Sequence, residues 1–228
     1  KAYTFIDAAK NWIPNQKKFF KKDQYYFLKT HNSLEEYFGN KFTTSSETIG
    51  GIYIVRDPRN VISSMCNHYA LDLDKAYAKM IDANSSLSFK LADEDYSNFT
   101  FLGKWSNHYW SWKNNMNFKT LIIKYEDLRD NTFEEFRKII NFIEDLKGTN
   151  NEINEEKLEN SINSTSFSKL KNKEKMYGFG ESTVSKDGKP INFFNLGFKN
   201  QWENLLPKEM SDKIKDEFIN ELKDLKYE

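Results

Sequence analysis

The sequence predicts an α/β fold in which helices flank a parallel sheet. Three short apolar segments, Tyr25–Thr30, Gly51–Val55 and Thr120–Tyr125, have the composition of buried strands. The second and third strands are followed by the helical patterns Pro58–Tyr69 and Thr132–Leu146. Strands that alternate with helices along a chain typically form a parallel sheet with helices packed on its faces.

Each predicted helix has its own signal. Pro58 suits the first turn of the segment Pro58–Tyr69, where no amide hydrogen is needed. The apolar residues of Thr132–Leu146 recur at the spacing of one helix face. Phe99–Asn114 is an aromatic amphipathic pattern between two strands, and Lys208–Leu225 predicts a C-terminal helix. Both are expected to cover the sheet.

The stretch Met176–Lys199 shows neither the apolar spacing of a helix nor the alternation of a strand, and it contains four of the nine glycines. This composition predicts a long loop. Loops of such length in compact domains are usually functional or disordered.

Composition bounds the class of protein. With 228 residues, one domain over 1–228 is the simplest expectation. The 34 basic and 34 acidic residues balance, which argues against a nucleic acid partner or an anionic membrane. No apolar run approaches the ~18 residues of a membrane span. Aromatic residues make up 16% of the chain and supply the buried area that a disordered chain lacks.

The chain carries one cysteine, Cys66, which excludes an internal disulfide framework and fits a reducing, cytoplasmic compartment. It begins at Lys1 without an initiator Met or a signal peptide pattern. We therefore expect a chain truncated at its N-terminus.

Lys29 and His31 stand at the end of the first predicted strand. Alternate residues of a strand point to the same face, so the two side chains should project together. Ligands of open α/β sheets bind at the carboxyl ends of strands, and a neighbouring ammonium favours the neutral imidazole that accepts a proton. His31 is therefore a candidate general base. The alternative is a histidine that hydrogen-bonds the Asn32–Ser33 turn.

Arg56 lies between the second predicted strand and its helix. Helix N-termini attract anions, and the planar guanidinium suits a phosphate. The helix presents a polar stripe at positions i, i+3, i+4 and i+7, namely Asn60, Ser63, Ser64 and Asn67. The alternative is that Arg56 pairs with Asp57 or with a helix of the same domain, while the polar stripe faces water.

Tyr125 ends the third predicted strand beside Glu126 and Asp127. Its ring could stack on a base, or it could be a core tyrosine with a satisfied hydroxyl. Thr165, Ser166 and Phe167 precede the segment Lys169–Lys175 and first suggest a helix N-cap.

Other kinds of site are not indicated. The histidines His31, His68 and His108 are dispersed, and His108 lies in an aromatic helix where a structural role is favoured, so we expect no metal site. Neither a Walker sequence nor a dinucleotide fingerprint follows any of the predicted strands.

Four ordered motifs carry a family resemblance. They are FLKTH (Phe27–His31), YIVRDPRNVISSMCNHY (Tyr53–Tyr69), IIKYEDL (Ile122–Leu128) and STSF (Ser164–Phe167). Together they resemble the sulfotransferases that use 3'-phosphoadenosine 5'-phosphosulfate (PAPS). The resemblance implies a three-layer P-loop-type α/β fold and transfer of a sulfuryl group from PAPS to an acceptor hydroxyl or amine, with no metal required.

The resemblance also implies residue roles. His31 would deprotonate the acceptor and Lys29 would contact the sulfuryl group. Arg56 and Ser64 would bind the 3'-phosphate of the nucleotide. Tyr125 and Thr165 would lie near the adenine.

A further segment, FFNLGFKNQW (Phe193–Trp202), is similar to the family's C-terminal loop R-K-G-x-x-G-x-W. Gly197 and Trp202 match, and Gly197 is a candidate 3'-phosphate contact. The loop departs from the family at three positions, Asn195, Leu196 and Asn200, so that two cations are missing. Lys199 is expected to compensate in part.

The family's 5'-phosphosulfate loop, of the type P-K-S-G-T-T-W, would precede this chain. Two alternatives therefore accompany the sulfotransferase interpretation: a nucleotide phosphotransferase on the same fold, and a non-catalytic nucleotide-binding or scaffold protein. The expected partner is a small-molecule acceptor, whose identity the sequence leaves open, as it does the oligomeric state.

Overall fold

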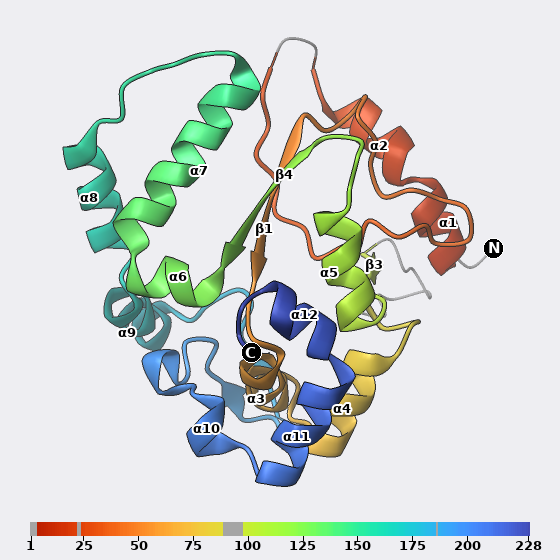
Figure 1. The fold of residues 1–228 in the computed structure, drawn as a ribbon, viewed down its shortest axis with the longest axis vertical. Coiled ribbons are helices and arrows are strands. Elements are labelled where there is room, and N and C mark those ends of the chain that lie inside the picture. The colour runs from red at the N-terminus through yellow and green to blue at the C-terminus, as the bar shows by residue number, and fades with distance from the viewer. Residues whose placement is uncertain (1–3, 22–23, 89–97, 186) are drawn as a thin grey trace. The chain divides into compact units, whose positions relative to one another are not determined.

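A computed structural model describes residues 4–21, 24–88, 98–185 and 187–228 (Figure 1). The chain divides into two compact units. Unit 1 comprises Lys1–Tyr53 and Lys79–Ile122, and unit 2 comprises Ile54–Ala78 and Ile123–Glu228. Each unit has its own buried residues.

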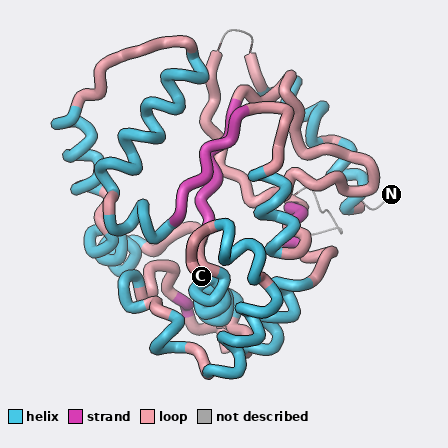
Figure 2. Tube along the Cα trace, viewed as in Figure 1, coloured by secondary structure: helices cyan, strands magenta, loops and turns pink. Residues whose placement is uncertain are grey.

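Two strands, β1 (Gly50–Val55) and β4 (Lys119–Lys124), form a hydrogen-bonded pair. They run side by side in Figure 2, and their arrows point the same way in Figure 1. Gly51 allows β1 to pass close to the Trp112 ring, because a Cβ at Gly51 would lie 2.8 Å from an atom of that ring. The predictions for these two strands are confirmed, except that Tyr125 begins a helix instead of ending β4.

The predicted strand Tyr25–Thr30 is wrong. The segment has no regular secondary structure, and the side chains of Tyr25, Phe27 and Leu28 are 58%, 73% and 64% exposed. A strand requires hydrogen bonds to a neighbouring strand, and β1 is paired with β4 in the described part of the chain. Its apolar composition predicted a strand, but the segment is not hydrogen-bonded into the β1–β4 pair.

Unit 1 is built mainly from short elements. They are α1 (Phe5–Lys10), α2 (Trp12–Phe19), the antiparallel pair β2 (Ser86–Leu87) and β3 (Thr100–Phe101), and α5 (Trp105–Lys113). Its core cluster contains Ala8, Phe99 and Phe101, with Phe5, Trp12 and Tyr37 packed against it.

The predicted helix Phe99–Asn114 begins later than expected, because its first residues take other conformations. Phe101 pairs with Ser86 in the antiparallel strands, and Gly103 follows with a φ of +66°. A left-handed residue cannot continue a right-handed helix, so α5 starts beyond it.

Unit 2 is mostly helical, and α4 (Leu73–Ile81) runs from it into unit 1. Its other elements are α3 (Pro58–Tyr69), α6 (Tyr125–Asp130), α7 (Thr132–Lys147), α8 (Glu155–Ser164), α9 (Phe167–Tyr177), β5 (Thr183–Val184), β6 (Pro190–Ile191), the 3-10 turn η2 (Gly197–Lys199), α10 (Trp202–Leu205), α11 (Lys208–Glu217) and α12 (Ile219–Asp224). The side chains of Ile62, Ile214, Phe218 and Leu222 are fully buried and form its centre.

Two predictions for unit 2 are confirmed and two need correction. Helices α3 and α7 match their predicted segments. The C-terminal helix is interrupted at Phe218, where φ is −116° and the buried ring faces the core. The expected loop Met176–Lys199 begins inside α9 and contains the β5–β6 hairpin and the 3-10 turn.

No helix in the described ranges is long and apolar enough to cross a membrane.

Candidate functional site

Arg56 occupies the junction between β1 and α3. The strand ends at Val55 and the helix begins at Pro58, with Asp57 as its N-cap. The Asp57 carboxylate accepts a hydrogen bond from the Arg59 amide at 2.8 Å and forms an ion pair with the Arg59 guanidinium at 2.7 Å. Asp57 is thus used to cap the helix and hold Arg59, which leaves Arg56 to other partners.

Those partners come from three distant segments of unit 2. Arg56 Nη1 donates to Ser64 Oγ at 3.3 Å, and Nη2 donates to the Asn200 carbonyl at 3.3 Å. The guanidinium carbon lies 4.5 Å from the centre of the Tyr125 ring, and Nε lies 3.7 Å from Glu126 Oε1. We call these five residues the Arg56 cluster. The structure therefore brings together three residues that the sequence singled out: Arg56, Ser64 and Tyr125.

Burial lowers the pKa of the Arg56 guanidinium, and the nearby charge of Arg129 lowers it further, while Tyr125 and Glu126 oppose the shift. A guanidinium remains charged under these conditions. A half-buried cation whose fork reaches a hydroxyl and a carbonyl has the chemistry of an anion site.

The polar stripe of α3 contacts the C-terminal loop. Asn60 Oδ1 accepts from the Trp202 amide at 2.8 Å, and Asn200 Nδ2 donates to Asn60 O at 3.2 Å and to Ser64 Oγ at 2.8 Å. Asn67 Nδ2 donates to the Asn192 carbonyl at 3.4 Å. The alternative in which this stripe simply faces water is therefore wrong, because the loop's backbone needs these polar partners.

The chain end adds residues that the sequence reasoning missed. The Tyr227 hydroxyl donates to Glu126 Oε2, and burial together with this carboxylate raises the Tyr227 pKa. The Arg59 guanidinium pairs with Glu228 at 2.5 Å and stacks 4.1 Å from the Trp202 ring. Lone residues at a chain end carry no pattern that could have indicated these contacts.

Gly197 lets the loop approach α9. Its φ is +57°, and a Cβ there would lie 2.7 Å from ring atoms of Phe167. Lys171 Nζ donates to the Asn195 carbonyl at 2.6 Å. Between the helix and the loop lies a cavity of about 430 Å³, lined by Phe167, Lys171, Asn195, Leu196, Phe198 and Lys199.

Thr165 ends α8, where its hydroxyl donates to the Ser161 carbonyl at 2.8 Å. The N-cap of α9 is the next residue, Ser166, which lies within the segment predicted to cap this helix, although its side chain makes no capping hydrogen bond. The position of Thr165 is exposed and adjoins Phe167, a lining residue of the cavity.

Lys29 and His31 lie in unit 1, in a stretch that we call the His31 segment (residues 29–35). These two residues are exposed, whereas Asn32 and Ser33 are buried. Its backbone is held by α5 and β3. The His31 carbonyl contacts His108 Nε2 at 3.1 Å, the Asn32 carbonyl accepts from Trp112 Nε1 at 3.0 Å, and the Ser33 amide donates to the Phe101 carbonyl at 2.8 Å. The backbone carbonyl of His31, the candidate base, and that of the next residue are thus fixed in position.

His108 has a defined protonation state in this arrangement. A carbonyl can only accept, so Nε2 carries the hydrogen that binds His31 O. Nδ1 then accepts from the Tyr53 hydroxyl, 3.0 Å away. Burial lowers the His108 pKa and raises that of Tyr53, which keeps both groups neutral. His108 is therefore a structural histidine, as its sequence context indicates.

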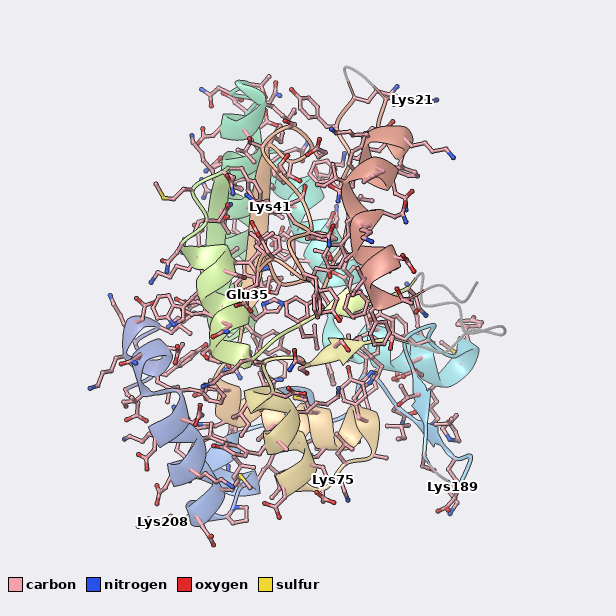
Figure 3. The ribbon with its side chains drawn as sticks, turned by 90° about the vertical axis from the view of Figure 1, so that its right-hand side faces the viewer. Lys21, Glu35, Lys41, Lys75, Lys189 and Lys208 are labelled. Atoms are coloured by element: carbon pink, nitrogen blue, oxygen red, sulfur yellow. The ribbon has the colours of Figure 1, made fainter. Side chains whose placement is uncertain are left out.

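The far end of the His31 segment contacts the same helix. Figure 3 marks Glu35 beside α5, where Oε1 accepts from Asn107 Nδ2 at 3.1 Å. Burial raises the Glu35 pKa, and the Asn107 hydrogen bond partly opposes the shift.

Comparisons of the whole chain with known proteins concern its family and its fold. The family model of the sulfotransferase domain matches residues 5–226. No curated protein sequence matches the chain. Among solved structures, a mouse sulfotransferase complexed with PAP is 20% identical, with a TM-score of 0.53, and the match covers 85% of this chain and 64% of that one.

Two structures of retinol dehydratase are also similar. The complex with androsterone and the inactive cofactor PAP is 18% identical, with a TM-score of 0.57, and covers 92% of this chain and 57% of the other. The complex with retinol and PAP is 20% identical, with a TM-score of 0.55, and the match covers 91% of this chain and 56% of the other. The chain thus spans about 56% to 64% of the length of these structures.

The likeness confirms the predicted fold class, a P-loop-like α/β fold with a parallel sheet and flanking helices. The family match extends over nearly the whole sequence and includes every motif on which the resemblance rested. The chain belongs to the sulfotransferase domain family.

Proposed function

We propose that the protein is a PAPS-dependent sulfotransferase, and that the Arg56 cluster binds the 3'-phosphate of the nucleotide. The observation that carries the proposal is the convergence on one guanidinium of Ser64, the Asn200 carbonyl and the Tyr125 ring. Tyr125 and Asn200 are far from Arg56 in the sequence, and each of these residues belongs to a motif with a proposed nucleotide role. Their meeting supports a shared ligand.

In the proposed reaction an acceptor hydroxyl or amine attacks the sulfur of PAPS. The new bond forms to sulfur, and the bond from sulfur to the bridging 5'-phosphate oxygen breaks, which releases 3'-phosphoadenosine 5'-phosphate (PAP). His31 takes the acceptor proton, and Lys29 stabilises the charge that develops on the sulfuryl and bridging oxygens. The nucleotide contacts supply binding and orientation.

Within the same proposal, Tyr125 and Thr165 lie near the adenine, while Gly197 and Lys199 belong to the 3'-phosphate loop. The acceptor is a small molecule with a hydroxyl or amine. A cytoplasmic setting is also proposed, because the single cysteine, Cys66, is a free thiol.

Calorimetric titration with PAP and with 5'-AMP, which lacks the 3'-phosphate, tests the nucleotide assignment. We expect the full-length protein to bind PAP more tightly than 5'-AMP. Arg56→Ala should lower the ratio of the two affinities about tenfold or more, as expected for the loss of a charge-assisted contact. Arg137→Ala is the control, because Arg137 lies on α7 outside the cluster and its side chain is 41% exposed. Equal affinity of the unaltered protein for both nucleotides would contradict the proposal.

A further inference from the structure

The Arg56 cluster is short of positive charge for the ligand it is proposed to bind. A phosphate monoester carries about −1.5 to −2 charges at neutral pH. The guanidinium of Arg56 is offset by Glu126, whose Oε1 lies 3.7 Å from Nε. The loop positions Asn195 and Leu196 are neutral. Another cation beside the loop would therefore be needed to balance the phosphate.

Arg129 is one cation of unit 2 near this loop, and it is already committed. Its Nε and Nη2 each donate to the Asp130 carboxylate at 2.6 Å. Its guanidinium lies 5.7 Å from the centre of the Phe198 ring. An ion pair with two parallel hydrogen bonds leaves little charge for a second anion.

Lys171 is placed differently. It lies on α9, one helical turn after Phe167, and its Nζ is 5.6 Å from the centre of that ring. Nζ donates to the carbonyl of Asn195 at 2.6 Å, so the ammonium stands against the loop at a residue that has no charge of its own. A carbonyl uses one of three ammonium hydrogens and neutralises none of its charge. Lys171 also lines the cavity beside Lys199.

Glu174 holds the loop in the position that makes this contact. Its side chain is buried, and its carboxylate accepts from the Phe193 amide at 2.6 Å, the Phe194 amide at 2.9 Å and Ser182 Oγ at 2.6 Å. Burial alone would raise the Glu174 pKa, but these hydrogen bonds and the charge of Lys171 lower it. The same face of α9 thus fixes the loop at residues 193–195 through one acceptor and one donor.

We propose that Lys171, on helix α9, supplies a positive charge to the 3'-phosphate subsite beside that of Lys199, in place of the charges that the loop lacks at Asn195 and Leu196. The inference rests on the proposed function, since it assumes that the subsite receives the 3'-phosphate. Lys171 and Lys199 both line the cavity, and the carbonyl of the next residue, Asn200, accepts from Arg56 Nη2. The loop thus links the cavity with the Arg56 cluster.

The test compares Lys171→Met with Lys171→Arg in the full-length protein, by calorimetric titration with PAP and 5'-AMP. We expect Lys171→Met to reduce the preference for PAP about tenfold while 5'-AMP binds as before, and Lys171→Arg to restore most of it. Lys175→Met is the matched control, because Lys175 is an exposed lysine in the last turn of the same helix.

Three outcomes would overturn the inference: an unchanged preference in Lys171→Met, an equal loss of affinity for both nucleotides, or no rescue by arginine. The second would indicate that Lys171 only stabilises the loop. Failure of the proposed function looks different, because the unaltered protein itself would then show no preference for PAP. A preference lost in Arg56→Ala but kept in Lys171→Met would reject this inference alone.

Discussion

The Arg56 cluster and the His31 segment are held in different ways. In the cluster, side chains that carry the proposed function contact one another directly, as Arg56 does with Ser64 and Tyr125. In the His31 segment, α5 and β3 contact the backbone carbonyls of His31 and Asn32. They also contact side chains beside the candidate base, such as those of Asn32 and Glu35. A binding site for an anion needs clustered donors, whereas a proton acceptor needs a fixed position and access to its substrate.

This difference predicts separable defects. Changes in the Arg56 cluster should alter nucleotide affinity, and changes in the His31 segment should alter the rate of transfer or the stability of the segment.

His31→Ala should have the largest effect. Loss of a general base is expected to lower kcat about 10²- to 10⁴-fold, while the affinity for PAP stays nearly unchanged. Steady-state assay of the full-length protein with an accepted hydroxyl or amine substrate, beside calorimetry with PAP, measures both. Turnover equal to that of the unaltered protein would remove His31 from the mechanism.

Gly197→Ala should weaken the other region. The residue has a φ of +57°, and the added Cβ would lie 2.7 Å from the Phe167 ring. We expect a loss of about 1–3 kcal/mol in the free energy of unfolding and weaker binding of PAP. Chemical denaturation measures the first quantity and calorimetry the second.

Gly180→Ala is the matched control for that change, because a Cβ at Gly180 meets no atom within 4 Å. It should alter stability by less than about 0.5 kcal/mol. Equal effects of the two substitutions would show that neither the positive φ of Gly197 nor its close approach to Phe167 requires glycine.

His108→Gln tests how the His31 segment is held, because His108 should make the stability of the protein depend on pH. Burial lowers the His108 pKa below its ordinary value of 6.5, so the unfolded chain binds this proton more readily than the folded one. The stability of the unaltered protein should therefore rise with pH between the lowered pKa and about 6.5, and fall on acidification through that window. Glutamine can still donate to the His31 carbonyl but does not titrate.

Chemical denaturation at pH 7.5 and pH 5.5 compares the two proteins. We expect the unaltered protein to lose about 1 kcal/mol more than His108→Gln on acidification. Identical losses would mean that His108 titrates alike in the folded and unfolded chains.

Asn67→Ala should have the smallest effect. Its Nδ2 donates to the Asn192 carbonyl at 3.4 Å in an exposed contact, at the edge of the polar stripe that reaches Asn60 and Ser64. We expect a change of no more than about 0.5 kcal/mol in stability and no change in the affinity for PAP. A marked loss of affinity would extend the proposed nucleotide site along α3.

The sequence by itself determined the elements whose signals are local. The apolar runs of β1 and β4 and the apolar spacing of α7 follow from composition and periodicity, and Pro58 marks the start of α3. The order of the motifs also determined the family, which the match over residues 5–226 confirms.

The tertiary structure decided what depends on partners from elsewhere in the chain. Tyr25–Thr30 has the composition of a strand, yet strand pairing and not composition makes a strand, and the segment is irregular. Phe99 and Phe101 fit a helical spacing, but the pairing of Phe101 with Ser86 and the positive φ of Gly103 place the helix start further on.

The same reason applies to the candidate site. Arg56 and Ser64 are eight residues apart on one strand–helix junction, so the sequence could indicate them as a pair. The contacts of Arg56 with Asn200, of Lys171 with Asn195 and of Glu174 with the loop amides join distant segments. Local patterns do not encode such contacts, because they form only when the loop packs against α3 and α9.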